Sequence, residues 1–451
     1  MNTKNKSGKD IIMFRTVFSL AHESKRTKTI LFSMLAFFFA LCLFTSFYYN
    51  NSLLLGSLEK FDNDDVKYLR SAQTLLQTGK LTYNYPPTPT CFIMPGIVLI
   101  ITPFVALFGL EGAIIPIRIL FALLQTVSLL MIFLIAKKVC NSKVGLFAVL
   151  LSILYLPNVY VSTLILTEAP SHLLILMITL FILHGTEQKK KRYFIVGGIL
   201  WGLAVMFRST LAAFPLVVFI YWLIKKYKFG EMVKFGLCAL IPFLVILAPW
   251  AIRNYVVFDK FVPLTYASGN PAWQGTVINY DWDRLNKEVM PYIQTDDIPP
   301  NGVSEIQDNE AETLKAQRIF AYTIKNNPAE YIYWYTIGKT LQNINFPFLW
   351  KPILIENFAV MAVWHWVILL VALYGVISKI IKKKFTHEMW FLFTMFWFFN
   401  CIHLPFFCFS RYMYPAMFIP IIAFARILAE SRLAARAETV FMKKQQSKLP
   451  E

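Results

Sequence analysis

Charged residues are scarce in this sequence, and their scarcity excludes an ordinary soluble protein. Asp, Glu, Lys and Arg make up 16% of the 451 residues, whereas a soluble domain carries about 25%. Hydrophobic residues account for 57%, and the mean hydropathy is +0.53. The apolar residues form uncharged runs close to the ~20 residues that cross ~30 Å of hydrocarbon. A disordered, fibrous or small disulfide-bonded secreted chain is excluded, and the sequence predicts an all-α polytopic membrane protein.

Cysteine, histidine and nucleotide-binding motifs are equally uninformative. The six cysteines are scattered without a Cys-x-x-Cys pair, so neither a disulfide framework nor a cysteine metal site is indicated. The six histidines show no zinc-binding spacing, and His365 and His403, which could line a cavity, are better explained as packed, hydrogen-bonded residues. No phosphate-binding loop, Gly-x-Gly-x-x-Gly or Gly-x-Ser-x-Gly motif stands between a strand and a helix. A nucleotide-driven ATPase and a soluble-type hydrolase are therefore unsupported.

Ten apolar runs are predicted to be transmembrane helices. They cover residues 29–49, 113–136, 143–160, 171–186, 193–209, 210–224, 234–256, 356–378, 389–409 and 412–430. The stretch 193–224 is divided because it is too long for one perpendicular helix, and the choice between one span and two stays open. An eleventh run, 92–110, is apolar enough to span but contains prolines and glycines, and proline within a helix removes a backbone hydrogen bond.

Basic clusters decide the sidedness, because Lys and Arg in short loops mark the cytoplasmic face. Six clusters occur, within 1–28, 137–143, 189–192, 225–234, 379–384 and 426–448. All six are cytoplasmic if 92–110 is an outer juxtamembrane or re-entrant helix, whereas every cluster after the first is outside if that run spans. We therefore expect a multi-pass protein of a bacterial plasma membrane with both termini cytoplasmic. The same clusters account for the net charge of +18 without a nucleic-acid partner.

This topology divides the chain into five parts. They are a cytoplasmic basic N-terminus at 1–28, a transmembrane catalytic module at 29–256 with its first outer loop and juxtamembrane helices at 50–112, a large outer loop at 257–355, the C-terminal transmembrane helices at 356–430, and a cytoplasmic basic tail at 431–451. The large outer loop holds most of the acidic residues and is rich in Tyr, Trp, Pro and Asn. We expect it to form a mixed, ordered subdomain rather than a linker.

Ionisable residues converge on the predicted outer face. Charged groups near a membrane are costly and point to function; here they are Asp62, Asp64, Asp65, Glu168, Arg208, Arg253 and Arg411. Arginine presents a fork of donors suited to phosphate, and a carboxylate can take a proton from a hydroxyl. Each arginine could instead extend to lipid headgroups, but three outward-facing arginines run against the positive-inside bias.

The first outer loop contains a predicted helix within FDNDDVKYLRSAQTLLQTGK, residues 61–80. Its apolar positions recur with helical spacing at Val66, Leu69, Ala72, Leu75 and Leu76. Asp62 or Asn63 can cap the helix, which places acids in the first turn near the positive end of the helix dipole. Three acids exceed what a cap requires, so we expect at least one to be free for chemistry.

Four motifs occur in order along the chain. D-D-x-x-Y with A-x-x-L-x-x-x-G runs from Asp64 to Gly79, PTCFIMPGIVLIITPFVALFG from Pro89 to Gly109, and LTEAP from Leu166 to Pro170; the fourth set is GLAVMFRST, PWAIRNYVVF and SRYMYP. Over residues 30–425 this pattern resembles the integral-membrane GT-C glycosyltransferases that use polyprenyl-phosphate sugars. The closest resemblance is to glycosyltransferase family 39, the dolichyl-phosphate-mannose-protein mannosyltransferase and aminoarabinose-transferase branch. Ile97-Val98 and Ser209 depart from that family's Tyr-Pro and Pro.

The resemblance implies a GT-C fold and a cavity at the outer membrane face. There a sugar would pass, with inversion, from undecaprenyl phosphate to a hydroxyl of a lipid, a cell-wall polymer or a protein. By motif, the catalytic acids are Asp64 as base, Asp65 beside it and Glu168 orienting the acceptor or a cation; the donor-phosphate ligands are Arg208, Arg253 and Arg411; and Lys67, Tyr68 and Tyr412 assist substrate binding. No cofactor is required, and a divalent cation is allowed.

Two other classes of function compete with a transferase. A membrane transporter or lipid flippase usually shows internal repeats and charges at the middle of the membrane, whereas this sequence shows no repeat and its charges gather at one face. A scaffold with a decayed site is disfavoured because Asp64, Glu168 and Arg411 are all present.

Overall fold

The described part of the chain is helical. The computed structural model describes residues 13–14 and 16–431; of the predicted basic termini, residues 1–12 and 432–451 lie outside the described residues. Eighteen α-helices, α2 to α19, follow one another, and the β-pairing within the described part amounts to two isolated bridges, Thr82 with Pro89 and Ile353 with Ile355. The all-α prediction is confirmed for these residues.

Five of the described helices are long and apolar enough to cross a membrane. They are α2 (Lys25–Tyr49), α5 (Ile114–Val139), α8 (Glu168–Gln188), α11 (Phe229–Phe258) and α17 (Phe358–Ile381). Two bent pairs raise this number to seven: α6 (Ser142–Leu154) with α7 (Pro157–Thr163), bent by 61°, and η7–η8 (Ser410–Ala416) with α19 (Phe418–Glu430), bent by 53°. Pro157 and Pro415 lie near the two bends, and proline cannot continue the backbone hydrogen bonds of the preceding turn.

The remaining three predicted spans are short helices. α9 (Lys191–Val205) and α18 (His387–Cys401) have 15 residues each, and η2 (Ser209–Ala213) with α10 (Pro215–Ile224) forms one more short apolar segment. At ~1.5 Å per residue, 15 residues fall short of ~30 Å of hydrocarbon. The chain is extended at Arg208, so α9 cannot continue into α10. The prediction of ten spans is therefore not confirmed: length and composition support five to seven, and 193–224 forms two helices.

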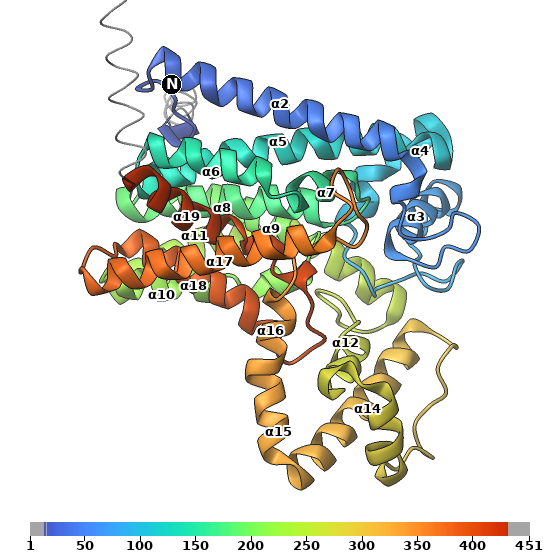
Figure 1. Cartoon of the computed structure of the whole chain (residues 1–451). Coiled ribbons are helices and arrows are strands. Elements are labelled where there is room, and N and C mark those ends of the chain that lie inside the picture. The colour runs from blue at the N-terminus through green and yellow to red at the C-terminus, as the bar shows by residue number, and fades with distance from the viewer. Residues whose placement is uncertain (1–12, 15, 432–451) are drawn as a thin grey trace, which may run out of the picture.

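The ambiguous run 92–110 forms α4 (Gly96–Gly112), which lies beside α3 (Asp64–Thr78) at one end of the bundle (Figure 1). Its start is fixed by a hydrogen bond from the Gly96 N–H to the Met206 carbonyl, 2.8 Å long. A Cβ at Gly96 would lie 2.5 Å from that carbonyl oxygen, so glycine is needed for this close approach. Gly109, with φ of 72°, breaks the helix near its end.

The bundle is built around α5 and α8, whose side chains are mostly buried. α5 packs against α2, α6 and α8. α9 lies between α8 and α11 and packs against both, and α19 packs against α6 and α17. In Figure 1, α2 and α5 run side by side along the length of the bundle. At the crossing of α9 and α11, the rings of Trp201 and Phe243 stack with centroids 3.6 Å apart. These contacts hold the short helix α9, and the chain that follows it, against the long α11.

Residues 259–357, here called the subdomain, project from the bundle in Figure 1. Their main helices are α12 (Gly269–Gly275), α14 (Glu305–Asn326), α15 (Pro328–Tyr333) and α16 (Lys339–Ile344). A small separate core contains Val277, Leu285, Ile293 and Ile319. The prediction of a mixed subdomain was wrong, because its described residues are helical: the Ser304 hydroxyl caps α14, and that amphipathic helix then runs for 22 residues.

Candidate active site

The three acids of the first loop lie at the start of helix α3: Asp62 precedes the helix, and Asp64 and Asp65 are in its first turn. Asn63 is its N-cap, as one of the two predicted alternatives, and its side chain accepts a hydrogen bond from the Asp64 N–H. The apolar positions Val66, Leu69 and Ala72 are buried, which fixes the rotation of the helix. α3 ends at Gly79, where φ is 71°, a backbone conformation that glycine adopts at little cost.

The three acids serve different purposes. The exposed Asp62 accepts a hydrogen bond from the Ser57 N–H at 2.8 Å. Asp65 is 1% exposed and accepts from the backbone N–H groups of Leu55 at 2.7 Å and Gly56 at 3.2 Å. Both carboxylates therefore hold the turn that precedes α3. Asp64 alone faces the arginine of the SRYMYP motif.

Arg411 joins Asp64 to Glu168. Its Nη1 donates to the Asp64 Oδ2 at 3.0 Å, its Nη2 donates to the Glu168 Oε2 at 3.3 Å, and its Nε donates to the Glu168 Oε1. Arg208 donates to the same Glu168 Oε1 at 3.1 Å. The structure thus brings two acids and two arginines together from α3, α8, the segment after α9 and η7. Two positive and two negative charges balance within this group, here called the charge cluster.

Burial within the charge cluster is graded. The Glu168 side chain is fully buried, those of Arg208 and Arg411 are each 11% exposed, and that of Asp64 is 39% exposed. A buried carboxylate needs partners of opposite charge, and Glu168 has two. Asp64 is the member of the cluster that remains open to solvent.

The chemical state of Asp64 follows from its neighbours. The Tyr83 hydroxyl donates to its Oδ1 at 2.6 Å. Burial alone would raise the pKa of Asp64, but the positive charge of Arg411 and the hydrogen bonds from Tyr83 and Arg411 together outweigh that effect and hold the pKa below its usual range. Asp64 is therefore a carboxylate at neutral pH, able to accept a proton.

A cavity of about 1080 Å³, including its open mouth, lies over the charge cluster. Five of the predicted site residues line it: Asp64, Tyr68, Arg208, Arg411 and Tyr412. The His403 ring stacks on the Tyr412 ring with centroids 4.3 Å apart, and its Nδ1 makes a 2.8 Å hydrogen bond to the Phe399 carbonyl. His403 is thus both packed, as predicted, and part of the cavity wall. The rest of the wall combines apolar and hydroxyl groups from the bundle and the subdomain, including Phe92, Ile93, Phe207, Ser209, Thr265, Ser268 and Phe406.

Two predicted binding residues lie elsewhere. Arg253 donates to the Thr90 carbonyl at 2.6 Å and to the Asn254 side chain at 2.9 Å, and it lines a separate groove with Leu75 and Trp250. Lys67 donates to the Asn84 Oδ1 at 3.0 Å and does not line the cavity. Like Asp65, neither residue is among those that line the cavity.

Sequence reasoning missed the groups that join the first loop to the subdomain beside the cavity. Glu305 on α14 accepts hydrogen bonds from the Asn84 N–H, at 2.9 Å, and from the Thr90 hydroxyl. The Tyr85 hydroxyl donates to Asp308 on the same helix, at 2.6 Å. These partners are more than 200 positions apart in the chain, so no local pattern relates them. Tyr83 was also missed, although it stands close to the first motif.

The donor set does not favour a metal ion at this site. Both carboxylates of the charge cluster already face guanidinium groups, and the described residues hold no group of three or more His, Cys, Asp or Glu side chains placed around one ion. A divalent cation would have to compete with Arg411 for the same carboxylate oxygens.

Residues 89–252 match the family model described as dolichyl-phosphate-mannose-protein mannosyltransferase. This match confirms the resemblance drawn from the motifs. It covers Glu168 and Arg208 but ends before Arg253 and does not reach Asp64 or Arg411. No curated protein sequence matches the chain.

Solved structures of an archaeal oligosaccharyltransferase share the fold. The archaeal oligosaccharyltransferase AglB from Archaeoglobus fulgidus, in complex with an inhibitory peptide and a dolichol-phosphate, aligns with a TM-score of 0.55 at 12% identity over 92% of this chain and 52% of its own. The apo form of the oligosaccharyltransferase from the same organism gives 0.57 at 11% identity, over 93% and 53%. ArnT from Cupriavidus metallidurans bound to undecaprenyl phosphate aligns at 0.42 and 15% identity, over 87% and 77%. The chain spans about half the length of the oligosaccharyltransferase, with which it shares the GT-C fold.

Proposed function

We propose that this protein is an integral-membrane glycosyltransferase that moves a sugar from a polyprenyl-phosphate donor, undecaprenyl phosphate in a bacterial membrane, to a hydroxyl acceptor. The observation that carries the proposal is the charge cluster beneath an open cavity. One partly exposed carboxylate and two mostly buried arginines meet there. The family match and the fold agree with this chemistry, since the matched model is that of a mannosyltransferase.

The reaction would use Asp64 as base and Arg411 as phosphate ligand. The acceptor oxygen bonds to the anomeric carbon of the sugar while the bond from that carbon to the phosphate oxygen breaks. The phosphate leaves with the electron pair, and Asp64 takes the proton of the acceptor hydroxyl. Because attack comes from the face opposite the phosphate, the anomeric configuration inverts. The leaving phosphate gains negative charge as the bond breaks, so a fixed guanidinium stabilises the transition state more than the ground state.

Donor binding would also activate the base. Arg411 is shared between Asp64 and Glu168, and a bound phosphate competes for its donors. When Arg411 turns toward the phosphate, Asp64 loses the charge that lowers its pKa and becomes a stronger base. Asp64 would therefore be a weak base in the free enzyme and a stronger one once the donor is bound.

The other predicted residues take supporting parts in this proposal. Glu168 is a positioning residue, because its buried carboxylate orients Arg208 and Arg411. Tyr68 and Tyr412 line the cavity and would contact substrate. Arg208 joins Arg411 at the phosphate. Asp65 and Arg253 hydrogen-bond to nearby backbone groups, and Lys67 hydrogen-bonds to the Asn84 side chain. We therefore assign these three residues a structural part, away from the reacting atoms.

The proposed site faces the outer side of the plasma membrane, and both termini are cytoplasmic. The lipid donor would enter from the bilayer, and the acceptor is a lipid, a cell-wall polymer or a protein. Arg208 and Arg411 supply the charge that a metal would otherwise provide. Turnover is therefore expected to survive a chelator such as EDTA, and loss of turnover that Mg²⁺ or Mn²⁺ restores would establish a metal requirement.

The test compares two neighbouring acids in liposomes. Wild type, Asp64→Asn and Asp62→Asn are reconstituted with a panel of undecaprenyl-phosphate sugars, and release of sugar is measured with and without a cell-envelope extract. Asp62→Asn is the matched control, because its remaining amide oxygen can still accept the Ser57 hydrogen bond. We expect Asp64→Asn to abolish turnover while thermal stability and donor binding persist. Turnover by Asp64→Asn at the wild-type rate would overturn the assignment of the base.

A transporter gives a different result in the same liposomes. A flippase moves the intact donor between leaflets, and the sugar stays bound to its phosphate. Translocation of labelled donor without sugar release, in wild type, would replace the transferase proposal.

A further inference from the structure

A second pocket lies at the end of the bundle opposite the charge cluster. It is bounded by the end of α5, the last turns of α17, the first half of α18 and one side of α19 from Ile419 to Ile427. The described residues that line this pocket are all different from those that line the cavity over the charge cluster. The pocket therefore cannot be part of the cavity in which the sugar would be transferred.

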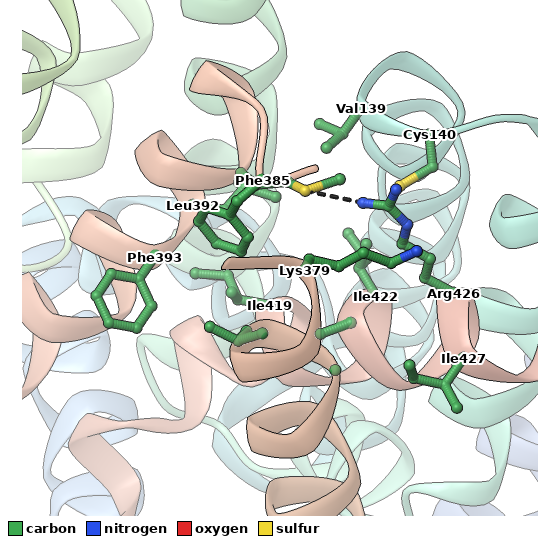
Figure 2. Close-up of a pocket in the computed structure, with 14 residues that line it drawn as sticks. Val139, Cys140, Lys379, Phe385, Leu392, Phe393, Ile419, Ile422, Arg426 and Ile427 are labelled. Carbon is green, nitrogen blue, oxygen red and sulfur yellow. Dashed lines mark hydrogen bonds between the residues drawn. The ribbon is translucent and has the colours of Figure 1, made fainter. Parts of the chain in front are cut away.

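Most of this pocket is apolar. Figure 2 shows its lining side chains, which include Val139, Leu392, Ile419, Ile422 and Ile427. The empty volume of the pocket, with its opening included, is about 530 Å³. On the adjoining surface of α17, Ile377 is 47% and Ile381 is 74% exposed. An apolar surface of this kind faces hydrocarbon when the helix lies in a membrane, so a lipid chain can reach the pocket sideways from the bilayer.

One rim of the pocket is basic. The Lys379 Nζ donates a hydrogen bond to the Glu430 Oε2, and the Arg426 Nε donates one to the Glu430 Oε1. Their side chains are only 13% and 19% exposed, whereas that of Glu430 is 45% exposed. Two mostly buried cations thus share one carboxylate that is nearly half exposed, which leaves an excess of one positive charge at the pocket.

The surroundings add to this excess. Lys382, Lys383 and Lys384 follow α17 directly and are exposed. Among the described residues, the Arg426 Nη1 donates to the sulfur of Met389, 2.8 Å away, which is a weak acceptor compared with oxygen. Guanidinium and ammonium groups are the usual partners of phosphate, and basic pockets between membrane helices take anionic lipid headgroups.

We propose that this pocket, bounded by Val139, Gly375, Lys379, Leu392, Ile422 and Arg426, binds one anionic diacyl phospholipid of the phosphatidylglycerol class. The phosphate lies against Lys379 and Arg426 and an acyl chain fills the apolar part. Charge complementarity selects the anionic headgroup, because a zwitterionic lipid would bring a third cation to a rim that already holds Lys379 and Arg426. The site does not depend on the proposed transferase reaction.

The test measures lipid binding to the purified full-length protein in detergent. Native mass spectrometry and thermal unfolding are followed during titration with phosphatidylglycerol, with phosphatidylcholine of the same acyl chains, and with inorganic phosphate. We expect a bound phosphatidylglycerol and a rise in Tm that phosphatidylcholine and inorganic phosphate do not reproduce. Equal effects of the two lipids, or a full effect of phosphate alone, would refute the site.

Substitutions then locate the binding. The double variant Lys379→Gln, Arg426→Gln should bind phosphatidylglycerol about tenfold more weakly, and Val376→Trp, which fills the apolar part, should weaken it while the charges remain. The matched control is Lys189→Gln, Lys225→Gln, which likewise removes two cations paired with glutamates, but outside the pocket. It should leave the affinity unchanged.

A gain of affinity gives the sharpest check, because a misfolded variant cannot produce it. Glu430→Gln removes the carboxylate that competes with phosphate for both cations, and it should bind phosphatidylglycerol several-fold more tightly than wild type. Unchanged or weaker binding by Glu430→Gln, or a lipid preference that survives the double variant, would place the phospholipid elsewhere. Preferential binding of undecaprenyl phosphate over phosphatidylglycerol would also overturn the proposed occupant.

Discussion

At the scale of single residues, Arg411 is the group on which the two acids converge. Its planar fork reaches Asp64 and Glu168 at once, which a lysine ammonium cannot do with the same geometry. We predict that Arg411→Lys lowers donor turnover about 10²- to 10³-fold, as loss of an oriented donor to a developing negative charge commonly does. Initial rates in liposomes provide the measurement. Arg253→Lys, placed outside the cavity, serves as the comparison, and an Arg411→Lys rate equal to that of wild type would contradict the phosphate assignment.

Lys339 is a second residue with a measurable consequence. It is fully buried on α16, its Nζ donates to the Leu404 carbonyl at 2.8 Å, and it lies 3.4 Å from the Tyr335 ring centroid. Burial lowers the pKa of Lys339 to about 7. The segment it holds continues to Phe406, in the cavity wall, and then to Arg411.

The pKa of Lys339 predicts how stability changes with pH. In the unfolded chain a lysine keeps its proton up to about pH 10.4, so between pH 7 and 10 the unfolded state binds more protons than the folded state. Stability therefore rises with pH over this window, by on the order of 1 kcal/mol per pH unit at most. We predict that Tm rises from pH 7 to 9 in wild type and in the exposed control Lys325→Gln, but not in Lys339→Gln. The same rise in Lys339→Gln would assign the effect to another group.

At the scale of elements, the crossing of α9 and α11 decides where Arg208 lies. A Cβ at Gly198 on α9 would lie 2.1 Å from the Ala239 carbonyl oxygen on α11, whereas Gly236 on α11 has open space around it. The identical substitution therefore has opposite expected effects at the two positions. Gly198→Ala forces the helices apart, and overpacking of this kind costs about 1–3 kcal/mol.

Thermal unfolding in detergent tests this crossing. We predict a Tm several degrees lower for Gly198→Ala, with reduced donor turnover because α9 leads into Arg208. Gly236→Ala should be neutral or slightly stabilising, since alanine is the better helix former. Equal Tm values for the two variants would mean that the helices can shift at little cost.

At the scale of the whole molecule, the subdomain forms part of the cavity wall, through Thr265, Ala267, Ser268 and Pro271, and is also bonded to the first loop. Glu305 on α14 accepts from Asn84 and Thr90 of the first loop, and the Phe407 N–H donates to the Pro271 carbonyl at 2.7 Å. The first loop, the subdomain and the segment before Arg411 are thus tied together around one opening. A motion of the subdomain would change the shape of the cavity.

Removal of the contact between Glu305 on α14 and the first loop should make that loop more mobile. We predict that Glu305→Ala raises amide hydrogen exchange in residues 80–92 several-fold and raises the KM for the acceptor more than it lowers kcat, because the substitution leaves the charge cluster untouched. Glu288→Ala, in an exposed ion pair within the subdomain, is the control. Exchange in residues 80–92 that matches the control would show that the loop holds its conformation without α14.

The sequence by itself determined the helices and the motifs. Apolar runs and helical spacing are local properties, so α2, α5, α8, α11 and α17 appear where hydropathy placed them. The motif order gave the family resemblance that the comparison then confirmed over residues 89–252. Hydropathy also set the number of apolar segments, but it could not say that several of them bend or stop short.

Only the tertiary structure decided which charges meet. Asp64 and Asp65 are adjacent and chemically alike, yet the rotation of α3, set by its buried face, sends one carboxylate to Arg411 and the other to the turn at Leu55 and Gly56. Arg208, Arg253 and Arg411 were all predicted to bind the donor phosphate, and packing brought two of them to Glu168 and left Arg253 on the Thr90 carbonyl. The physical reason is distance along the chain: a hydrogen bond between residues hundreds of positions apart depends on how whole helices pack, which no local pattern encodes.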